Sequence, residues 1–282
     1  FMIPAALFGI PSSIFAILGP LHLFMQFWYH TQLIGKLGLL EYILVTPSHH
    51  RVHHAINSEY IDKNYSQILI IWDKIFGTFQ PELDSVKPVY GTLKPMRTWN
   101  PVIINFKHLW HLIKDAWHAK RIIDKIRIWF MPTGWRPKDV EEKFPLEIIN
   151  DPKKQIKYET KNSTILIAWS WIQLTITNIL MFHFFISLST FSSILNYLYA
   201  FILILNIFSF TSLLDQRRYS LIAESIKVIL VFSLFYYQSF SWYGLEGLFA
   251  YIVGIYFITS FILNIFFHNE KNTNSAIAKT AI

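Results

Sequence analysis

Long apolar runs alternate with one extended polar region along this chain. No Asp, Glu, Lys or Arg occurs in residues 1–35 or in residues 162–214. A helix needs about 20 apolar residues to cross the ~30 Å hydrocarbon core of a bilayer. The pattern therefore predicts about five spans, one in residues 1–29 and about four in residues 162–268.

The second apolar region divides at its polar interruptions. A Ser- and Thr-rich stretch at 187–196 predicts a turn between two helices, and the charged residues at 215–218 end the second of them. Two further spans are expected at Leu221–Gln238 and Gly247–Phe267. They are followed by a polar tail at residues 269–282, which we expect to be mobile.

The first run differs from the others in its prolines. Pro4, Pro11 and Pro20 predict a kinked helix or a kinked helix pair in residues 1–29, because proline removes a backbone hydrogen bond. The chain also opens at Phe1, without an initiator Met and inside an apolar run. We interpret this start as an N-terminal truncation of a longer protein.

The distribution of charge predicts how these spans are oriented in the membrane. Most of the 25 Lys and Arg residues lie between Lys36 and Lys161, and the formal net charge is +7. Threading the spans places every basic residue on one side, with Lys227 expected to extend its amine from its helix to the interface. The positive-inside tendency makes that side the cytosol. Because charge alternates with lipid segments, we expect a membrane and not nucleic acid as partner.

The predicted fold is therefore an all-α, multi-span integral membrane protein with a cytosolic, histidine-rich, metal-binding cap. Residues 30–161 form the cytosolic or interfacial part. Within it, aromatic and apolar residues recur at three- and four-residue spacing in residues 105–129. That spacing suits an amphipathic helix against lipid headgroups or, equally, one packed on its own domain.

The absence of cysteine narrows the chemistry. Disulfides, iron–sulfur clusters and thiol nucleophiles are excluded from the given chain, so a metal in it needs nitrogen or oxygen ligands. Four of the eleven histidines lie within six residues, at His49, His50, His53 and His54. On a helix, positions i, i+3 and i+4 share a face, so these imidazoles can converge on Fe, Cu, Zn or Ni. His30, at the end of the first run, can turn towards the same metal.

A histidine that binds metal usually donates its other ring N–H to a carboxylate or carbonyl. Asp62, Asn64, Tyr65 and Asp73 follow the cluster closely and are the candidates for this supporting role. The other histidines are isolated or lie on the amphipathic stretch, and we interpret them as packing or interfacial residues: His22, His108, His111, His118, His183 and His268. Glu224 also stands alone within a predicted span.

Several segments together resemble the fatty acid hydroxylase/sterol desaturase superfamily. They are QFWYHT at 26–31, LEYILVTPSHHRVHH at 40–54, IDKNYSQILIIWDKIFGTF at 61–79 and Val89-Tyr90-Gly91. LLDQR at 213–217, followed by Glu224, is similar to the C-terminal membrane region of the branch that cleaves ether lipids.

The resemblance implies a function and a set of ligands. It implies two iron ions, O2 activation, and tetrahydrobiopterin as reductant, with a hydroxylated ether lipid breaking into a fatty aldehyde and a glycerol derivative. His50, His53 and His54 match the family's third histidine box, His30 matches a further histidine before it, and His49 is a further candidate ligand. The implied membrane is the endoplasmic reticulum in a eukaryote and the inner membrane in a bacterium. Pterin-contacting residues are not identified by the sequence, and no catalytic residue is expected beyond the metal ligands.

One departure concerns the rest of the ligand set. The family has two earlier histidine boxes, and neither occurs in the given chain.

Two alternative functions also stay open at this point. One is a sterol desaturase or fatty acid hydroxylase with a cytochrome b5-like donor, and the other is a non-catalytic metal transporter or sensor, which would need hydrated polar residues inside its spans.

Overall fold

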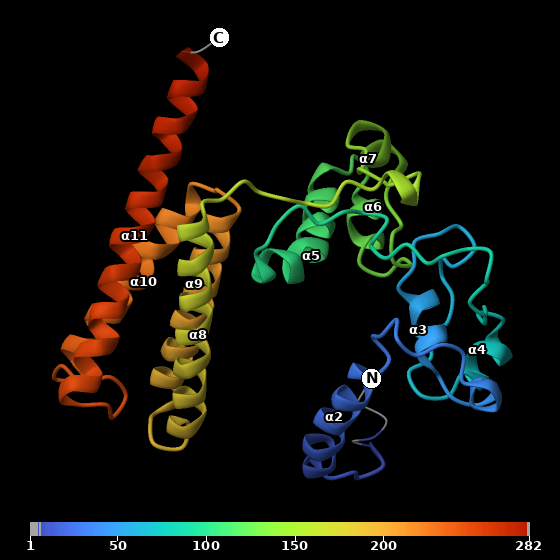
Figure 1. The fold of residues 1–282 in the computed structure, drawn as a ribbon, viewed down its shortest axis with the longest axis horizontal. Helices are drawn as coiled ribbons and strands as arrows, with labels where there is room; N and C mark the ends of the chain where they lie inside the picture. Colours follow the sequence, from blue (N-terminus) through green and yellow to red (C-terminus); the bar gives the residue numbers. More distant parts are fainter. Residues whose placement is uncertain (1–4, 6, 281–282) are drawn as a thin grey trace. The chain divides into compact units, whose positions relative to one another are not determined.

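The computed structural model describes residue 5 and residues 7–280 of the chain. These residues are helical and contain no β-strand, which confirms the all-α prediction (Figure 1). In chain order the elements are α2 (Ser12–Phe27), η1 (Gly38–Tyr42), α3 (Pro47–His53), α4 (Ile71–Phe76), α5 (Pro101–His118), α6 (Ile122–Arg127), α7 (Lys138–Lys143), η2 (Pro152–Lys154), α8 (Thr164–Ser187), α9 (Ser193–Leu214), α10 (Tyr219–Tyr237) and α11 (Gly247–Thr280).

The chain folds as two compact units. The first consists of Phe1–Pro95 with Leu146–Ile156, and the second of Met96–Pro145 with Lys157–Ile282. The histidine cluster therefore belongs to the first unit, whereas α5, α6 and α7 and the long apolar helices belong to the second.

Four helices are long and apolar enough to cross a membrane. They are α8, α9, α10 and the part of α11 up to His268. Successive helices pack side by side, with the α8–α9 turn and the α10–α11 loop at the same end (Figure 1). The four helices predicted after Lys161 are thus present, and the breaks fall at the Ser/Thr-rich turn and at Asp215.

At both ends of the chain, the helices differ in length from those that hydropathy predicts. The first apolar run contains α2, whose 16 residues, with Pro20 inside, fall short of a full span. Residues 1–4 and 6 of that run lie outside the described residues. At the other end α11 continues to Thr280 through the expected polar tail, and Ala281 and Ile282 lie outside the described residues. The mobility of that tail stays a prediction.

An aromatic cluster forms the core at one end of the four-helix bundle. Trp242, in the α10–α11 loop, is fully buried, and its ring centroid lies 5.2 Å from that of Tyr199 and 5.7 Å from that of Phe257. Aromatic pairs of this kind contribute about 0.5–1.5 kcal/mol each beyond burial. The loop is therefore held against the bundle by side-chain packing.

A polar network forms the middle of the same bundle. Lys227 Nζ lies 2.7 Å from Glu224 Oε1 and donates to Asn206 Oδ1 at 2.7 Å. Glu224 also accepts hydrogen bonds from Ser209 and from Ser260, and both charged side chains are completely buried. The expectation that Lys227 reaches the interface is wrong, because a carboxylate one helical turn away neutralises the ammonium inside the bundle.

The network reaches all four helices. Asn206 on α9 donates to Thr177 of α8 at 2.7 Å and to the Tyr256 hydroxyl of α11 at 2.8 Å. Gln173 of α8 accepts from the same Tyr256 hydroxyl at 3.0 Å. Glu224 is therefore not isolated, and these polar groups satisfy one another instead of lining an open path.

Candidate metal centre

The short helix α3 carries the histidine cluster. Pro47 occupies its first turn, where the missing N–H costs no hydrogen bond, and the helix ends at His53 with His54 as its C-cap. Because the helix repeats every 3.6 residues, His50 and His54 lie on one face. His53 projects from a neighbouring part of the surface.

His30, which follows α2, completes a group of three imidazoles. Its Nε2 lies 2.9 Å from His50 Nε2 and 3.2 Å from His54 Nε2, and the latter two atoms are 3.0 Å apart. In the described part of the chain, this is the group of three residues whose donor atoms could hold a metal ion. The structure thus brings together residues that are 20 positions apart in sequence.

The spacing of these three nitrogens fits a metal ion. Metal–imidazole bonds of about 2.1 Å that meet at right angles place the nitrogens about 3 Å apart. Three ring nitrogens facing one point cannot all donate to one another, whereas a cation can use all three lone pairs. The His30 Nδ1 lies 3.0 Å from the Gln26 carbonyl oxygen. That contact favours the tautomer with the proton on Nδ1, which leaves Nε2 free for a metal.

The ionisation of the cluster favours the same role. Burial, followed by the nearby His54, His30 and His53, lowers the pKa of His50 to about 3. The pKa of His54 is also lowered, mainly by burial. Both rings are therefore neutral near pH 7, and the neutral form is the one that binds metal.

The remaining two candidate ligands lie beside this group. The ring centroid of the exposed His53 is 5.6 Å from that of His50 and 5.1 Å from that of His54. His49 is almost fully buried, with its ring against Phe79 and Nδ1 3.4 Å from the Thr46 hydroxyl oxygen. His53 is thus positioned next to the three imidazoles, whereas His49 lies against the packed interior.

Asn64 and Asp73 support the site through the backbone. The Asn64 side chain donates to the carbonyl oxygens of His49, at 3.1 Å, and Gln80, at 2.7 Å. Asp73 accepts from the backbone amides of Tyr65 and Ser66, and hydrogen bonds of this kind lower its pKa although burial raises it. Both side chains fix the loops around α3 instead of contacting an imidazole.

Tyr65 lies beside His53 and is hydrogen-bonded to Asp62. The Tyr65 hydroxyl donates to Asp62 Oδ1 at 2.8 Å, and the Tyr65 ring centroid lies 6.1 Å from that of His53. This pair flanks the exposed side of the histidine cluster. The Gln26 backbone carbonyl, which contacts His30 Nδ1, is a partner of a candidate ligand ring that the sequence alone did not identify.

Arg51, inside the histidine motif, is a positioning residue that the sequence reading missed. Its Nη1 donates to the carbonyl oxygens of Thr31, at 2.9 Å, and Ile34, at 2.8 Å. Its Nε and Nη2 bind both carboxylate oxygens of Glu82, and both side chains are largely buried. Arg51 thereby ties the segment just after His30 to the helix that carries the other imidazoles. The sequence feature that could have indicated this role is an arginine within a histidine motif. Its planar guanidinium group can donate to several acceptors at once.

Replacing Arg51 with Lys should weaken metal binding by about 10- to 100-fold, the usual effect of losing a residue that orients a ligand. Lysine keeps the charge but cannot bind Glu82 in a bidentate manner and two carbonyls together. The measurement is iron content after dialysis against a graded chelator. Lys36→Arg serves as the matched control, because Lys36 forms an exposed ion pair with Asp84. Unchanged iron retention in Arg51→Lys would contradict the positioning role.

The other histidines have separate contacts. His22 lies 2.9 Å from Gln67 Oε1, and His183 lies 3.0 Å from the Tyr199 hydroxyl. His118 Nδ1 contacts the Lys114 carbonyl oxygen at 2.7 Å. Within the described residues, none of these histidines belongs to a group of three possible ligands.

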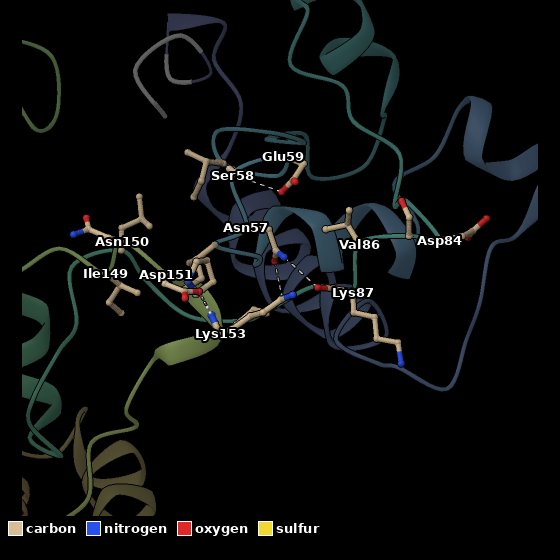
Figure 2. A pocket seen from close by; sticks show the side chains of 16 residues that line it. Asn57, Ser58, Glu59, Asp84, Val86, Lys87, Ile149, Asn150, Asp151 and Lys153 are labelled. Carbon is tan, nitrogen blue, oxygen red and sulfur yellow. Dashed lines mark hydrogen bonds between the residues drawn. The ribbon is translucent and has the colours of Figure 1, made fainter.

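The first unit also contains an open pocket of about 880 Å³ (Figure 2). It is formed by the loop after α3, by the segment 84–93 after α4 and by residues 149–153, with Glu59, Asp84 and Lys87 among its lining side chains. Asn57 accepts from the Val89 amide at its edge. No histidine lines the pocket, so it is distinct from the candidate metal centre.

Comparison with known proteins gives relatives of this chain. Residues 1–78 match the family model described as fatty acid hydroxylase. Human alkylglycerol monooxygenase is 36% identical over 235 residues, which are 83% of this chain and 52% of that protein. Zebrafish (Danio rerio) alkylglycerol monooxygenase is 46% identical over 137 residues, 49% of this chain and 30% of the relative.

A bacterial relative matches a shorter region. The ornithine lipid hydroxylase OlsE of Rhizobium tropici is 35% identical over 77 residues, 27% of this chain and 23% of that protein. No solved structure matches.

A helical chain with four apolar helices of spanning length and a converging histidine group thus defines a membrane protein of the histidine-motif type. Its residues 1–78 match the fatty acid hydroxylase family, and relatives that match most of the chain are named alkylglycerol monooxygenase. It spans about half the length of the human and Xenopus tropicalis relatives.

Proposed function

We propose that the protein is a membrane-bound di-iron monooxygenase that hydroxylates a lipid C–H bond, with an alkylglycerol as substrate. The observation that carries the proposal is the convergence of His30, His50 and His54 within a segment that matches the fatty acid hydroxylase family. The names of the human and zebrafish relatives supply the substrate class.

The overall reaction balances with O2 and a two-electron donor. One oxygen atom enters the C–H bond next to the ether oxygen, and the other leaves as water with two protons and two electrons from the donor. The resulting hemiacetal then breaks its C–O bond to give a fatty aldehyde and a free glycerol hydroxyl. We propose tetrahydrobiopterin as the donor.

The residues of this chain have separate roles in that reaction. His30, His50 and His54 would hold one iron, and the adjacent His53 would serve the second; His49 stays a candidate ligand. Asn64, Asp73 and Arg51 keep these rings in place through the backbone. The bound iron supplies the oxygen activation, and the protein supplies neutral imidazoles and a fixed geometry.

The membrane setting fits a lipid substrate. Four helices of spanning length hold the second unit in a bilayer, where a long alkyl chain partitions. We propose that the histidine cluster lies on the cytosolic face, since most Lys and Arg residues outside the spans flank it in sequence. A eukaryotic protein of this kind would reside in the endoplasmic reticulum and a bacterial one in the inner membrane.

One alternative function differs from the proposed one in its reductant, and the other is not an enzyme. A cytochrome b5-dependent desaturase or hydroxylase would use the same imidazoles, but the relatives named alkylglycerol monooxygenase favour the ether-lipid reaction. A transporter would need a hydrated path through the spans, whereas the buried polar groups there are bonded to one another.

A reductant exchange tests the donor. Purified full-length protein in detergent is given an alkylglycerol and O2 with either tetrahydrobiopterin or reduced cytochrome b5, and fatty aldehyde is measured. We expect aldehyde with the pterin alone. Turnover supported only by cytochrome b5 would exclude the pterin, and turnover of a sterol or free fatty acid instead of the ether lipid would exclude the proposed substrate.

A further inference from the structure

The helices α5 and α6 have their polar and apolar sides reversed relative to a helix that packs on a soluble domain. Asp115 is 8% exposed and forms a bidentate ion pair with Arg136, at 2.6 Å and 2.9 Å. By contrast Trp117 is 80% exposed and Phe130, just after α6, is 83% exposed. The carboxylate faces the protein and the aromatic rings face outward.

Four of the exposed apolar side chains of α5 share one face. Phe106, Trp110, Ile113 and Trp117 follow one another at spacings of four, three and four residues, and all are exposed. Such spacing places side chains in one stripe along a helix. Beyond the helix, Ile122, Ile126 and Phe130 extend the exposed apolar surface along α6. We call the exposed side chains of these seven residues the aromatic face.

Basic side chains surround the aromatic face. Residues 101–130 contain two acidic residues, and both are largely buried: Asp115 and Asp124. The basic side chains of the same segment include Lys114, Lys120, Arg121 and Lys125. Lys114 Nζ lies over the Trp110 ring, 5.4 Å from its centroid. Aromatic residues on one side with cations beside them are typical of helices that lie in the headgroup region of a membrane.

The start of α5 is fixed to the end of a membrane-spanning helix. Asn100, which caps α5, is fully buried and donates to the Phe208 carbonyl oxygen and to the Ser212 hydroxyl, both in the last two turns of α9. The adjacent Thr98 and the Trp99 amide donate to Asp215, which caps the same helix. Because α9 is long and apolar enough to cross a bilayer, a helix fixed to its end would begin at the level of the lipid headgroups.

We propose that the aromatic face binds the surface of the surrounding bilayer and that its basic border selects anionic lipid headgroups. The aromatic rings enter the boundary between headgroups and acyl chains, and the Lys and Arg side chains contact phosphate and carboxylate groups. Each basic side chain near an anionic surface contributes about a fivefold preference for binding.

The absence of cysteine from the chain allows a direct test. A bimane fluorophore is attached to Trp117→Cys or, separately, to Phe130→Cys, and the protein is reconstituted in nanodiscs of mixed phosphatidylcholine and phosphatidylglycerol. One preparation carries bromine on the phosphatidylglycerol chains and the other carries it on the phosphatidylcholine chains. We expect quenching at both sites, stronger with brominated phosphatidylglycerol. Glu142→Cys, at an exposed position on α7, is the control and should show little quenching.

Charge variants test the selectivity. In Lys114→Gln/Lys120→Gln/Arg121→Gln the preference for phosphatidylglycerol should fall by about fivefold for each charge removed, whereas Lys138→Gln/Lys143→Gln on α7 should keep it. Absence of quenching by either lipid at positions 117 and 130 would overturn the proposal, because the face would then be covered by protein or left in water. Equal quenching by the two lipids would overturn the selection of anionic headgroups.

Discussion

His50→Ala should abolish aldehyde formation and remove iron from the purified protein. His50 is the residue whose Nε2 lies about equally close to the other two ring nitrogens, at 2.9 Å from His30 and 3.0 Å from His54. Removing a residue that orients a ligand costs about 10- to 100-fold in metal affinity, so losing a ligand itself should cost at least about 100-fold. The measurements are iron per protein by atomic spectroscopy and aldehyde yield from an alkylglycerol.

His53→Ala should behave differently in the metal assay. Because His53 lies beside the three convergent imidazoles, we expect it to lower the iron content from two ions to one while also abolishing turnover. His268→Ala is the control, since His268 makes only long contacts, 3.5 Å to the Ser220 hydroxyl and 3.4 Å to the Arg218 carbonyl oxygen. Aldehyde formation that survives His53→Ala would contradict the proposed ligand set.

Lys227→Met should destabilise the four-helix bundle by about 3–5 kcal/mol, because it leaves the Glu224 carboxylate buried without its counter-charge. Glu224→Leu should have a comparable effect. The double variant Glu224→Leu/Lys227→Met should recover much of the loss, since an apolar pair of similar volume can replace a buried ion pair at little net cost. The free energy of unfolding in bicelles, with a double-mutant cycle, measures the coupling.

The exposed ion pair between Lys36 and Asp84 provides the comparison for this cycle. Its side chains are 47% and 93% exposed, so Lys36→Met should leave the free energy of unfolding nearly unchanged. If both single variants at 224 and 227 were as mild as Lys36→Met, the polar network would not hold the bundle together.

The sequence predicts the features that depend on local periodicity. Uncharged runs long enough for a bilayer correspond to α8, α9, α10 and α11, and the charged residues at 215–218 mark the break between two of them. The i, i+4 spacing of His50 and His54 likewise places both rings on one face of α3. These are properties of single helices, which residue spacing determines directly.

Contacts between segments that are distant in sequence could not be predicted from residue spacing. Arg51 binds Glu82, which is 31 positions away, and this pairing follows from the loop path and not from any local pattern. Lys227 was expected at the interface because hydropathy treats each residue separately. The i, i+3 spacing to Glu224 was the signal that a neutralised pair could be buried.

Residue spacing also does not predict which atoms the polar side chains near the cluster contact, as the expected supporting residues show: Asp62, Asn64, Tyr65 and Asp73. Their position close to the cluster in sequence suggested contacts with the imidazoles, whereas Asn64 and Asp73 hydrogen-bond to the backbone of neighbouring loops. Which atom a polar side chain contacts depends on the loop geometry, including the left-handed backbone of Asp62 and Asn64, at φ 56° and 53°. Such geometry cannot be read from residue spacing.

The central claim is that the histidine group of this chain belongs to an O2-dependent oxygenase that acts on ether lipids. Its most direct test is to supply the full-length protein with an alkylglycerol, tetrahydrobiopterin and 18O2, and to reduce the fatty aldehyde at once to the alcohol so that its oxygen cannot exchange with water. We expect one 18O atom in the fatty alcohol from the wild-type protein and no product from His50→Ala. Product formed with oxygen from water alone, or formed equally by His50→Ala, would contradict this claim.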